Sequence, residues 1–179
     1  MKNIFVKTIS RAAFAILMMT MIAQVRVSAQ DVETEDQGKD QTQEDLSSRR
    51  GNARIVGTWD VQVTIRVCQT GAAIRTFASI GTFNSGGTTL DSTSGIPQSL
   101  KTPGQGVWNY IGERDYRFKF KSFSFDASGN FTGWTIINHR AHLNRQADEY
   151  DSAGTTEVYA PTGVLLFTGC ATTTAVRFE

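Results

Sequence analysis

The chain has 179 residues, of which 40% are hydrophobic, and its 18 basic and 17 acidic residues nearly balance. Residues 1–29 hold four positive charges and no negative one, which leaves 14 basic against 17 acidic residues in the remainder. A chain with this balance has no basic face of the kind that binds nucleic acid or an acidic membrane surface. We therefore expect neither as a partner.

Residues 1–29 have the pattern of a secretory signal peptide. Positive charges precede an apolar run, residues 12–23, and Val27-Ser28-Ala29 then offers the small residues that a signal peptidase reads. The run is shorter than the roughly 20 apolar residues that a membrane span needs. We therefore expect cleavage before Gln30 and export to the periplasm or beyond the cell, with no membrane span left in the mature protein.

The next segment, residues 30–53, is rich in Asp, Glu and Gln and poor in apolar residues. Such a sequence cannot bury enough surface to offset the entropy lost on ordering, so it is predicted to be a disordered acidic leader. Residues 54–179 remain as one domain, and about 125 residues are enough for a single core.

After residue 50 the sequence alternates short β-rich runs with turn residues, and no helical period of useful length follows. Connections of about two to five residues favour antiparallel neighbours over crossover helices. Eight such runs in sequence are typical of an all-β fold, either an eight-stranded antiparallel up-and-down barrel or a sandwich. The runs are approximately 55–67, 73–84, 87–94, 105–111, 115–125, 130–143, 147–159 and 164–178.

The first run has the clearest faces, because apolar side chains alternate with polar ones from Trp59 to Val67. Alternation of this kind indicates a strand with one buried and one solvated face. A buried Trp also needs a partner for its indole N–H, and we expect that partner at the far end of the chain.

Two later segments have specific interpretations. In 115–125 the aromatic alternation shifts by one residue near Lys121-Ser122, which predicts a β-bulge there. The connection from Ser92 to Gln105 is the longest and is too long for a plain turn. It covers one mouth of the barrel or is a mobile surface loop without a role.

The two cysteines of the mature chain provide a test of barrel closure. Cys68 ends the first run and Cys170 lies in the last, and in an exported protein a disulfide between them is expected. A register that sets them opposite each other closes the barrel between its first and last strands and places Val61 opposite Arg177. Facing residues share a side, so Arg177 points to the same interior as Trp59.

A Gly-x-Trp at the start of the first strand, Gly57 and Trp59, with Arg177 near the end of the last resembles the lipocalins and the wider calycin superfamily. The resemblance implies that the Trp closes the barrel floor and that the Arg packs across its ring and hydrogen-bonds near the start of the barrel. The second lipocalin motif and the helix before the last strand are absent from the sequence pattern. The chain thus resembles a minimal bacterial lipocalin-like domain or an allene-oxide-cyclase-like barrel.

An unusually large aromatic set accompanies this layout. An eight-stranded barrel is just wide enough to hold one small ligand or to be filled by its own side chains. The aromatic residues therefore either line an apolar ligand cavity or fill it. They are Phe77, Phe83, Trp108, Tyr116, Phe118, Phe120, Phe131 and Trp134.

Candidate catalytic chemistry is sparse. His139 and His142 have opposite strand parity and cannot share a metal, and no third ligand accompanies them. One of them could bind haem from inside a barrel, as in nitrobindin-like relatives, or serve as an ordinary polar residue. The carboxylates Asp115, Asp148, Glu149 and Asp151 fall at strand ends, where solvated turn residues are usual. We assign no catalytic residue, cofactor or metal.

The sequence thus favours an exported, monomeric, lipocalin-like barrel that binds a small hydrophobic molecule. Two alternatives stay open. One is a secreted structural or interaction barrel with a filled core, and the other is a cyclase- or isomerase-type enzyme. A perturbed carboxylate that faces the cavity would favour the enzyme.

Overall fold

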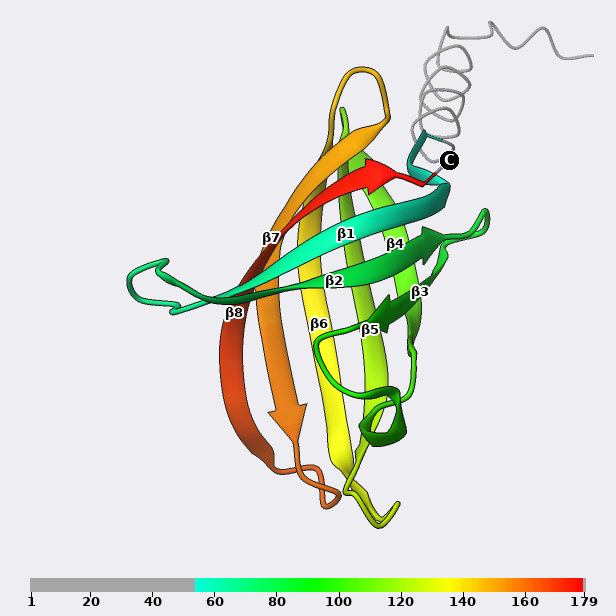
Figure 1. Ribbon diagram of the computed structural model, residues 1–179. Coiled ribbons are helices and arrows are strands. Elements are labelled where there is room, and N and C mark those ends of the chain that lie inside the picture. The colour runs from blue at the N-terminus through cyan, green and yellow to red at the C-terminus, as the bar shows by residue number, and fades with distance from the viewer. Residues whose placement is uncertain (1–53, 179) are drawn as a thin grey trace, which may run out of the picture. The chain divides into compact units, whose positions relative to one another are not determined.

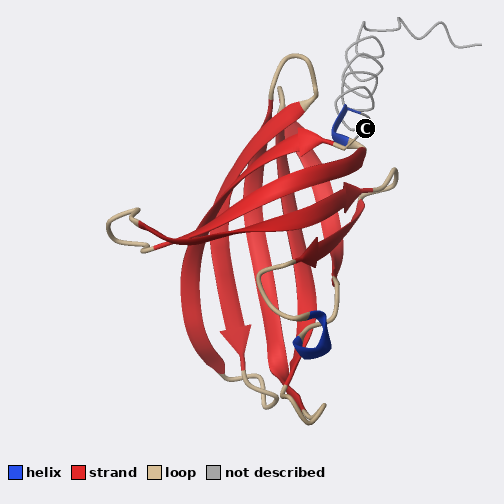
Figure 2. Cartoon of the chain, viewed as in Figure 1, coloured by secondary structure: helices blue, strands red, loops and turns tan. Residues whose placement is uncertain are grey.

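The computed structural model describes residues 54–178, and these form eight antiparallel strands closed into a barrel in simple up-and-down order (Figures 1 and 2). This confirms the predicted fold class. The expected signal peptide and acidic leader lie outside the described residues. The strands are β1 (Gly57–Arg66), β2 (Ala73–Phe83), β3 (Thr88–Thr93), β4 (Gly104–Gly112), β5 (Asp115–Phe125), β6 (Phe131–Leu143), β7 (Glu149–Tyr159) and β8 (Leu165–Arg177), with one short 3₁₀ helix, η1 (Gln98–Leu100).

The barrel closes where β1 pairs with β8, as predicted, but the register differs from the predicted one by two residues. Trp59 faces Arg177, and Arg66 faces Cys170. The predicted register had set Cys68 opposite Cys170 and Val61 opposite Arg177. A shift of two keeps the side-chain parity, so Arg177 still lies on the same side as Trp59.

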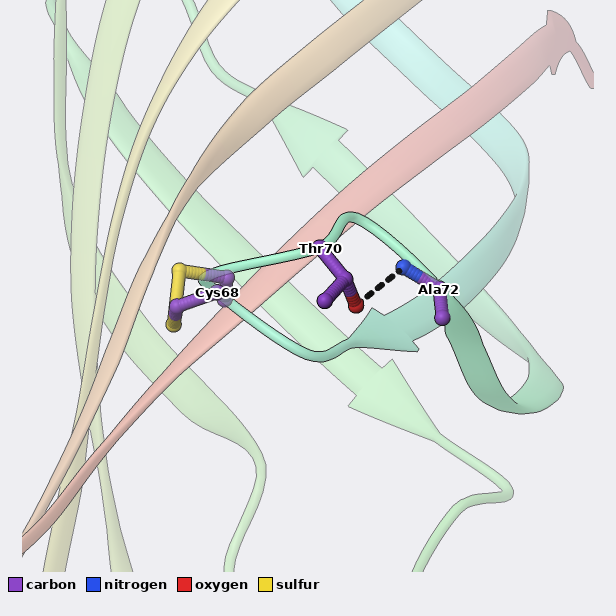
Figure 3. Close-up of a disulfide and its surroundings, with 4 residues drawn as sticks. Cys68, Thr70 and Ala72 are labelled. Atoms are coloured by element: carbon purple, nitrogen blue, oxygen red, sulfur yellow. Dashed lines mark hydrogen bonds between the residues drawn. A yellow bond between two sulfur atoms is a disulfide. The ribbon is translucent and has the colours of Figure 1, made fainter.

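The physical reason for this shift is that β1 ends at Arg66, so Cys68 belongs to the turn that follows. From there it reaches back to form the disulfide with Cys170, with 5.2 Å between their Cα atoms (Figure 3). The turn is held by a hydrogen bond from the Ala72 amide to the hydroxyl of Thr70. The expected disulfide pairing is therefore present in the structure.

One end of the barrel is sealed by Trp59 and Arg177. The Arg177 guanidinium carbon lies 4.4 Å from the centre of the Trp59 ring. The same guanidinium donates four hydrogen bonds, of 2.7–2.9 Å, to the carbonyls of Ala147, Val56 and Arg54. It thereby ties the start and end of the barrel together, as the sequence resemblance implied.

The indole N–H of Trp59 was expected to find its partner at the far end of the chain, and this prediction is wrong. It donates to the Ile55 carbonyl at 3.0 Å, only four residues upstream. The reason is that Ile55 lies just before β1, is itself fully buried, and has its carbonyl beside the indole. The far end of the chain supplies the stacked guanidinium instead.

The bulge expected near Lys121-Ser122 is also absent at that position. Pairing between β5 and β6 is continuous there and shifts only between Ser124 and Phe125, which leaves Thr132 of β6 unpaired. Side-chain alternation therefore continues past Lys121: Ser122 is buried inside the barrel and Phe123 is exposed. The change of aromatic parity in the sequence reflects aromatic residues on both faces, not a displaced backbone.

Behind the seal, aromatic rings pack edge to face in the closed end of the barrel. Trp59 contacts Tyr150 with ring centres 4.9 Å apart, and Phe83 contacts Tyr150 and Trp108 at 6.0 Å. Edge-to-face pairs of this kind contribute about 0.5–1.5 kcal/mol each beyond the area they bury. This end of the interior is therefore filled. Among residues 54–178, no helix is long and apolar enough to cross a membrane.

Candidate ligand cavity

The remaining interior contains a cavity of about 230 Å³. Side chains from every strand except β4 line it, and most of them are apolar, such as Val63, Ile65, Ile137 and Val158. These residues reach the interior because side chains alternate between the two faces of a β-strand, and each strand turns its more apolar face inward. The barrel is thus filled at the Trp59 end and hollow beyond it.

The predicted aromatic residues divide into three groups, of which the first lines the cavity. Phe77, Phe83, Phe118 and Phe120 contribute to its wall. Phe118 and Phe120 stack with ring centres 6.2 Å apart, and Phe83 packs against Phe118 at 5.5 Å. These four rings form the aromatic part of the wall.

The second group, Trp108 and Tyr116, is buried in the filled end and does not line the cavity. The Trp108 indole N–H donates to the Asn84 carbonyl at 3.0 Å. Burial raises the pKa of Tyr116 to about 12, because the phenolate would lose its contact with water. Both side chains therefore belong to the packed core and not to the cavity wall.

The third group, Phe131 and Trp134, lies on the outer face of β6, so their expected place in the cavity is corrected. Trp134 stacks on Tyr159 with ring centres 5.5 Å apart, and the Lys121 ammonium lies 4.1 Å from the Trp134 ring centre. Phe131 is 43% exposed. The side chains of β6 that point into the barrel are those of Thr135, Ile137 and His139. Trp134 precedes Thr135 and therefore faces outward, because side chains alternate along a strand.

The connection between β3 and β4 contributes to the wall. Gly95, Ile96 and Lys101 line the cavity, and η1 lies beside β5 (Figure 1). Gly95 lies so close to Phe77 that an added Cβ would be 2.7 Å from its ring. The connection is therefore part of the cavity wall and not a free surface loop. That it covers one mouth of the barrel stays a prediction.

Two attachments hold this connection in place. The Arg75 guanidinium of β2 donates to the Gly95 carbonyl at 2.5 Å. At the other end, Thr102 exchanges two hydrogen bonds of 3.0 Å with the backbone of Phe123 on β5. The connection thus joins β2 to β5, which are separated in the sheet by β3 and β4.

A charged pair interrupts the apolar wall. The Lys101 ammonium lies 3.7 Å from Asp91 Oδ1, and the Ser79 hydroxyl donates to Asp91 Oδ2 at 2.6 Å. Burial raises the pKa of Asp91, although Ser79 and Lys101 oppose the shift, and burial lowers the pKa of Lys101, which Asp91 opposes. The cavity therefore has one strongly polar spot on its β3 side.

A second polar group lies on the β6 side. His139 is 3% exposed, and its Nδ1 lies 2.8 Å from the Ser152 hydroxyl, which is 2.6 Å from the Thr173 hydroxyl. Burial lowers the pKa of His139 to about 4, so the ring is neutral at pH 7. His142 has the opposite parity, as predicted, and on the outer face its Nδ1 lies 2.7 Å from Asp115. Asp115 also accepts from Arg140 at 2.6 Å.

Sequence reasoning missed Asp91 and Lys101. In the run Thr89-Leu90-Asp91, an apolar residue alternates with polar ones, so hydrophobicity predicts Leu90 inside. In the structure Leu90 is 45% exposed although it also reaches the cavity wall, whereas Asp91 faces the cavity with only 16% of its side chain exposed. The one available signal was a lysine in the long connection, and only the fold shows that it points inward.

Within residues 54–178 no cluster of three or more His, Cys, Asp or Glu side chains is placed to hold a metal ion. The architecture defines the class of the protein as a closed eight-stranded up-and-down β-barrel. No protein-family model matches the chain, and no curated protein matches it in sequence. Among solved structures, the chain is similar to Rv2717c from M. tuberculosis, with 9% identity and a TM-score of 0.36 over 74% of this chain and 98% of that one.

Proposed function

We propose that the barrel binds a small, predominantly apolar molecule in its interior. The observation that supports this function is the cavity of about 230 Å³ lined by aliphatic and aromatic side chains. Apolar cavities with a few polar groups are the usual form of small-molecule sites. A barrel with a purely structural role would gain stability by filling this space, because each buried void costs packing energy.

A fluorescence experiment tests this proposal. The neutral probe N-phenyl-1-naphthylamine should bind with enhanced, blue-shifted emission. Ala171, which is buried on β8 and lines the cavity, is the position at which to block it. Ala171→Phe should abolish the enhancement, whereas Thr174→Phe, at an exposed position on the same strand, should leave it unchanged.

Overpacking costs about 1–3 kcal/mol, so thermal unfolding of both variants must show that they are folded. Equal probe binding by the wild-type protein and a folded Ala171→Phe variant would contradict the proposal, because the probe would then bind outside the barrel.

We also propose that the protein is exported and acts as a monomer. The Cys68–Cys170 disulfide is compatible with an oxidising compartment, and residues 1–29 have the pattern of a signal peptide. N-terminal sequencing of protein from its own host should find Gln30 first. A chain that retains Met1 in the cytoplasm would contradict export.

A cyclase- or isomerase-type activity is the second candidate, and Asp91 favours it. Its carboxyl group faces the cavity and burial raises its pKa, a pairing that occurs often at acid–base sites. The test is to incubate the molecule extracted from the purified protein with fresh protein and to separate the products by chromatography. A product of unchanged mass and altered retention, lost in Asp91→Asn, would support catalysis.

A further inference from the structure

The charged pair in the cavity wall lies at the long end of the salt-bridge range. A direct hydrogen bond between an ammonium and a carboxylate is about 2.7–2.9 Å long, whereas the Lys101–Asp91 distance is 3.7 Å. Both side chains are largely buried, with 9% and 16% of their surfaces exposed. Both line the cavity. The pair is therefore close enough for charge attraction but is not closed by a direct bond of normal length.

Each partner retains unused hydrogen-bonding capacity. Ser79 occupies Oδ2 of Asp91, which leaves Oδ1 as the oxygen nearest Lys101. Within the described part of the chain, Asp91 is the ion-pair partner of Lys101, and an ammonium has three donors. A polar contact longer than about 3.5 Å leaves each group able to bond a third group, such as a bridging water molecule.

The chemistry of that third group is restricted. It must accept from the Lys101 ammonium and donate to Oδ1 of Asp91, and a hydroxyl group does both. A carboxylate would be repelled by Asp91 and an alkylammonium by Lys101, in surroundings that screen charge poorly. An alkyl group would leave both charges unbridged and shielded from water, which is costly.

We propose that Asp91 and Lys101 form a subsite for the hydroxyl group of a neutral, otherwise apolar ligand, such as a small alcohol or phenol. The inference rests on the proposed binding function and specifies its ligand class. Burial raises the pKa of Asp91 and lowers that of Lys101, which disfavours the charged form of each. A hydroxyl group that hydrogen-bonds to both would offset this by stabilising the charged pair. The ligand's apolar body would lie against Phe118 and Phe120.

Three probes with one aromatic body test the subsite: 2-naphthol, naphthalene and 2-naphthoate. Each is titrated against the complex of N-phenyl-1-naphthylamine with the full-length mature protein at neutral pH, and its affinity is read from the loss of probe fluorescence. A hydrogen bond to charged groups is expected to make 2-naphthol bind about tenfold or more tightly than naphthalene. 2-Naphthoate should bind more weakly than 2-naphthol.

A double variant, Asp91→Asn with Lys101→Met, removes both charges together and leaves neither one unpaired. It should lose the preference for 2-naphthol and keep its affinity for naphthalene. Lys119→Met, on the exposed outer face of β5, is the matched control and should keep the preference. Even if the double variant does not fold, the affinities of the three probes for the wild-type protein still test whether the subsite prefers a hydroxyl group.

The outcomes distinguish a failure of the proposed hydroxyl subsite from a failure of the proposed binding function. Equal affinity for 2-naphthol and naphthalene in the wild-type protein would overturn the subsite and leave the binding function intact. Tightest binding of 2-naphthoate would overturn the hydroxyl assignment in favour of an anionic group. If N-phenyl-1-naphthylamine binds but none of the three probes displaces it, the subsite is overturned and the binding function stands. If N-phenyl-1-naphthylamine itself does not bind, the proposed binding function fails, and the subsite with it.

Discussion

Arg177 provides the most stringent test of how the barrel is closed. Its guanidinium makes four hydrogen bonds to three backbone carbonyls and stacks on Trp59. Arg177→Met keeps an unbranched apolar side chain but leaves those carbonyls without their donors. Hydrogen bonds to charged groups contribute about 1.5–3 kcal/mol each, and the cation–π contact about 0.5–2 kcal/mol. Water replaces part of the loss because the residue is half-buried, and we expect about 4 kcal/mol in total.

The assay is urea and thermal unfolding followed by circular dichroism. For a domain of about 125 residues, a loss of 4 kcal/mol corresponds to a fall of roughly 12–20 °C in melting temperature. Arg177→Lys should recover only part of it, because an ammonium cannot make the same set of bonds. Arg117→Met, at an exposed position on β5, should have little effect. A loss below about 1 kcal/mol in Arg177→Met would refute this account of the seal.

Three further outcomes are expected. Gly57→Ala should cost about 1–3 kcal/mol, and more than Gly112→Ala, because both glycines have positive φ (139° and 122°) but only at Gly57 would a Cβ meet Arg177, at 2.5 Å. Replacing Cys68 and Cys170 by Ser should lower the unfolding free energy by up to about 4–5 kcal/mol, since the disulfide spans 102 residues; an unchanged urea midpoint would contradict it. His139 has a pKa of about 4 when folded against 6.5 ordinarily, so the unfolded chain is protonated first as the pH falls. Stability should be full above about pH 6.5 and decline toward pH 4 by about 3 kcal/mol, and His139→Gln should remove that decline.

The fold was predictable because its determinants are local and repetitive. Strand alternation, short turns and the position of Cys68 and Cys170 together predicted eight strands and closure between the first and the last. The exact register was not predictable, because it depends on where β1 ends. Alternation gives the face of each residue, but a register two residues away has the same faces. The turn that holds Cys68 outside the ladder is visible only in three dimensions.

The cavity was less predictable than the fold. Hydrophobicity identified Phe77, Phe83, Phe118 and Phe120 among the residues of its wall, but it also selected Phe131 and Trp134, which pack on the outer face. A sequence does not distinguish an aromatic residue buried inside a barrel from one stacked outside on a neighbouring strand. Asp91 was missed for the opposite reason, because a charged residue in a short polar strand is normally solvated.

The central claim is that the interior holds a small molecule, and native mass spectrometry of the protein purified from its own host tests it most directly. We expect a species heavier than the mature polypeptide by the mass of one small neutral compound, which dissociates on gentle activation and is absent from Ala171→Phe. A bare polypeptide mass, together with no uptake of N-phenyl-1-naphthylamine in solution, would contradict the claim and leave a barrel with an empty interior.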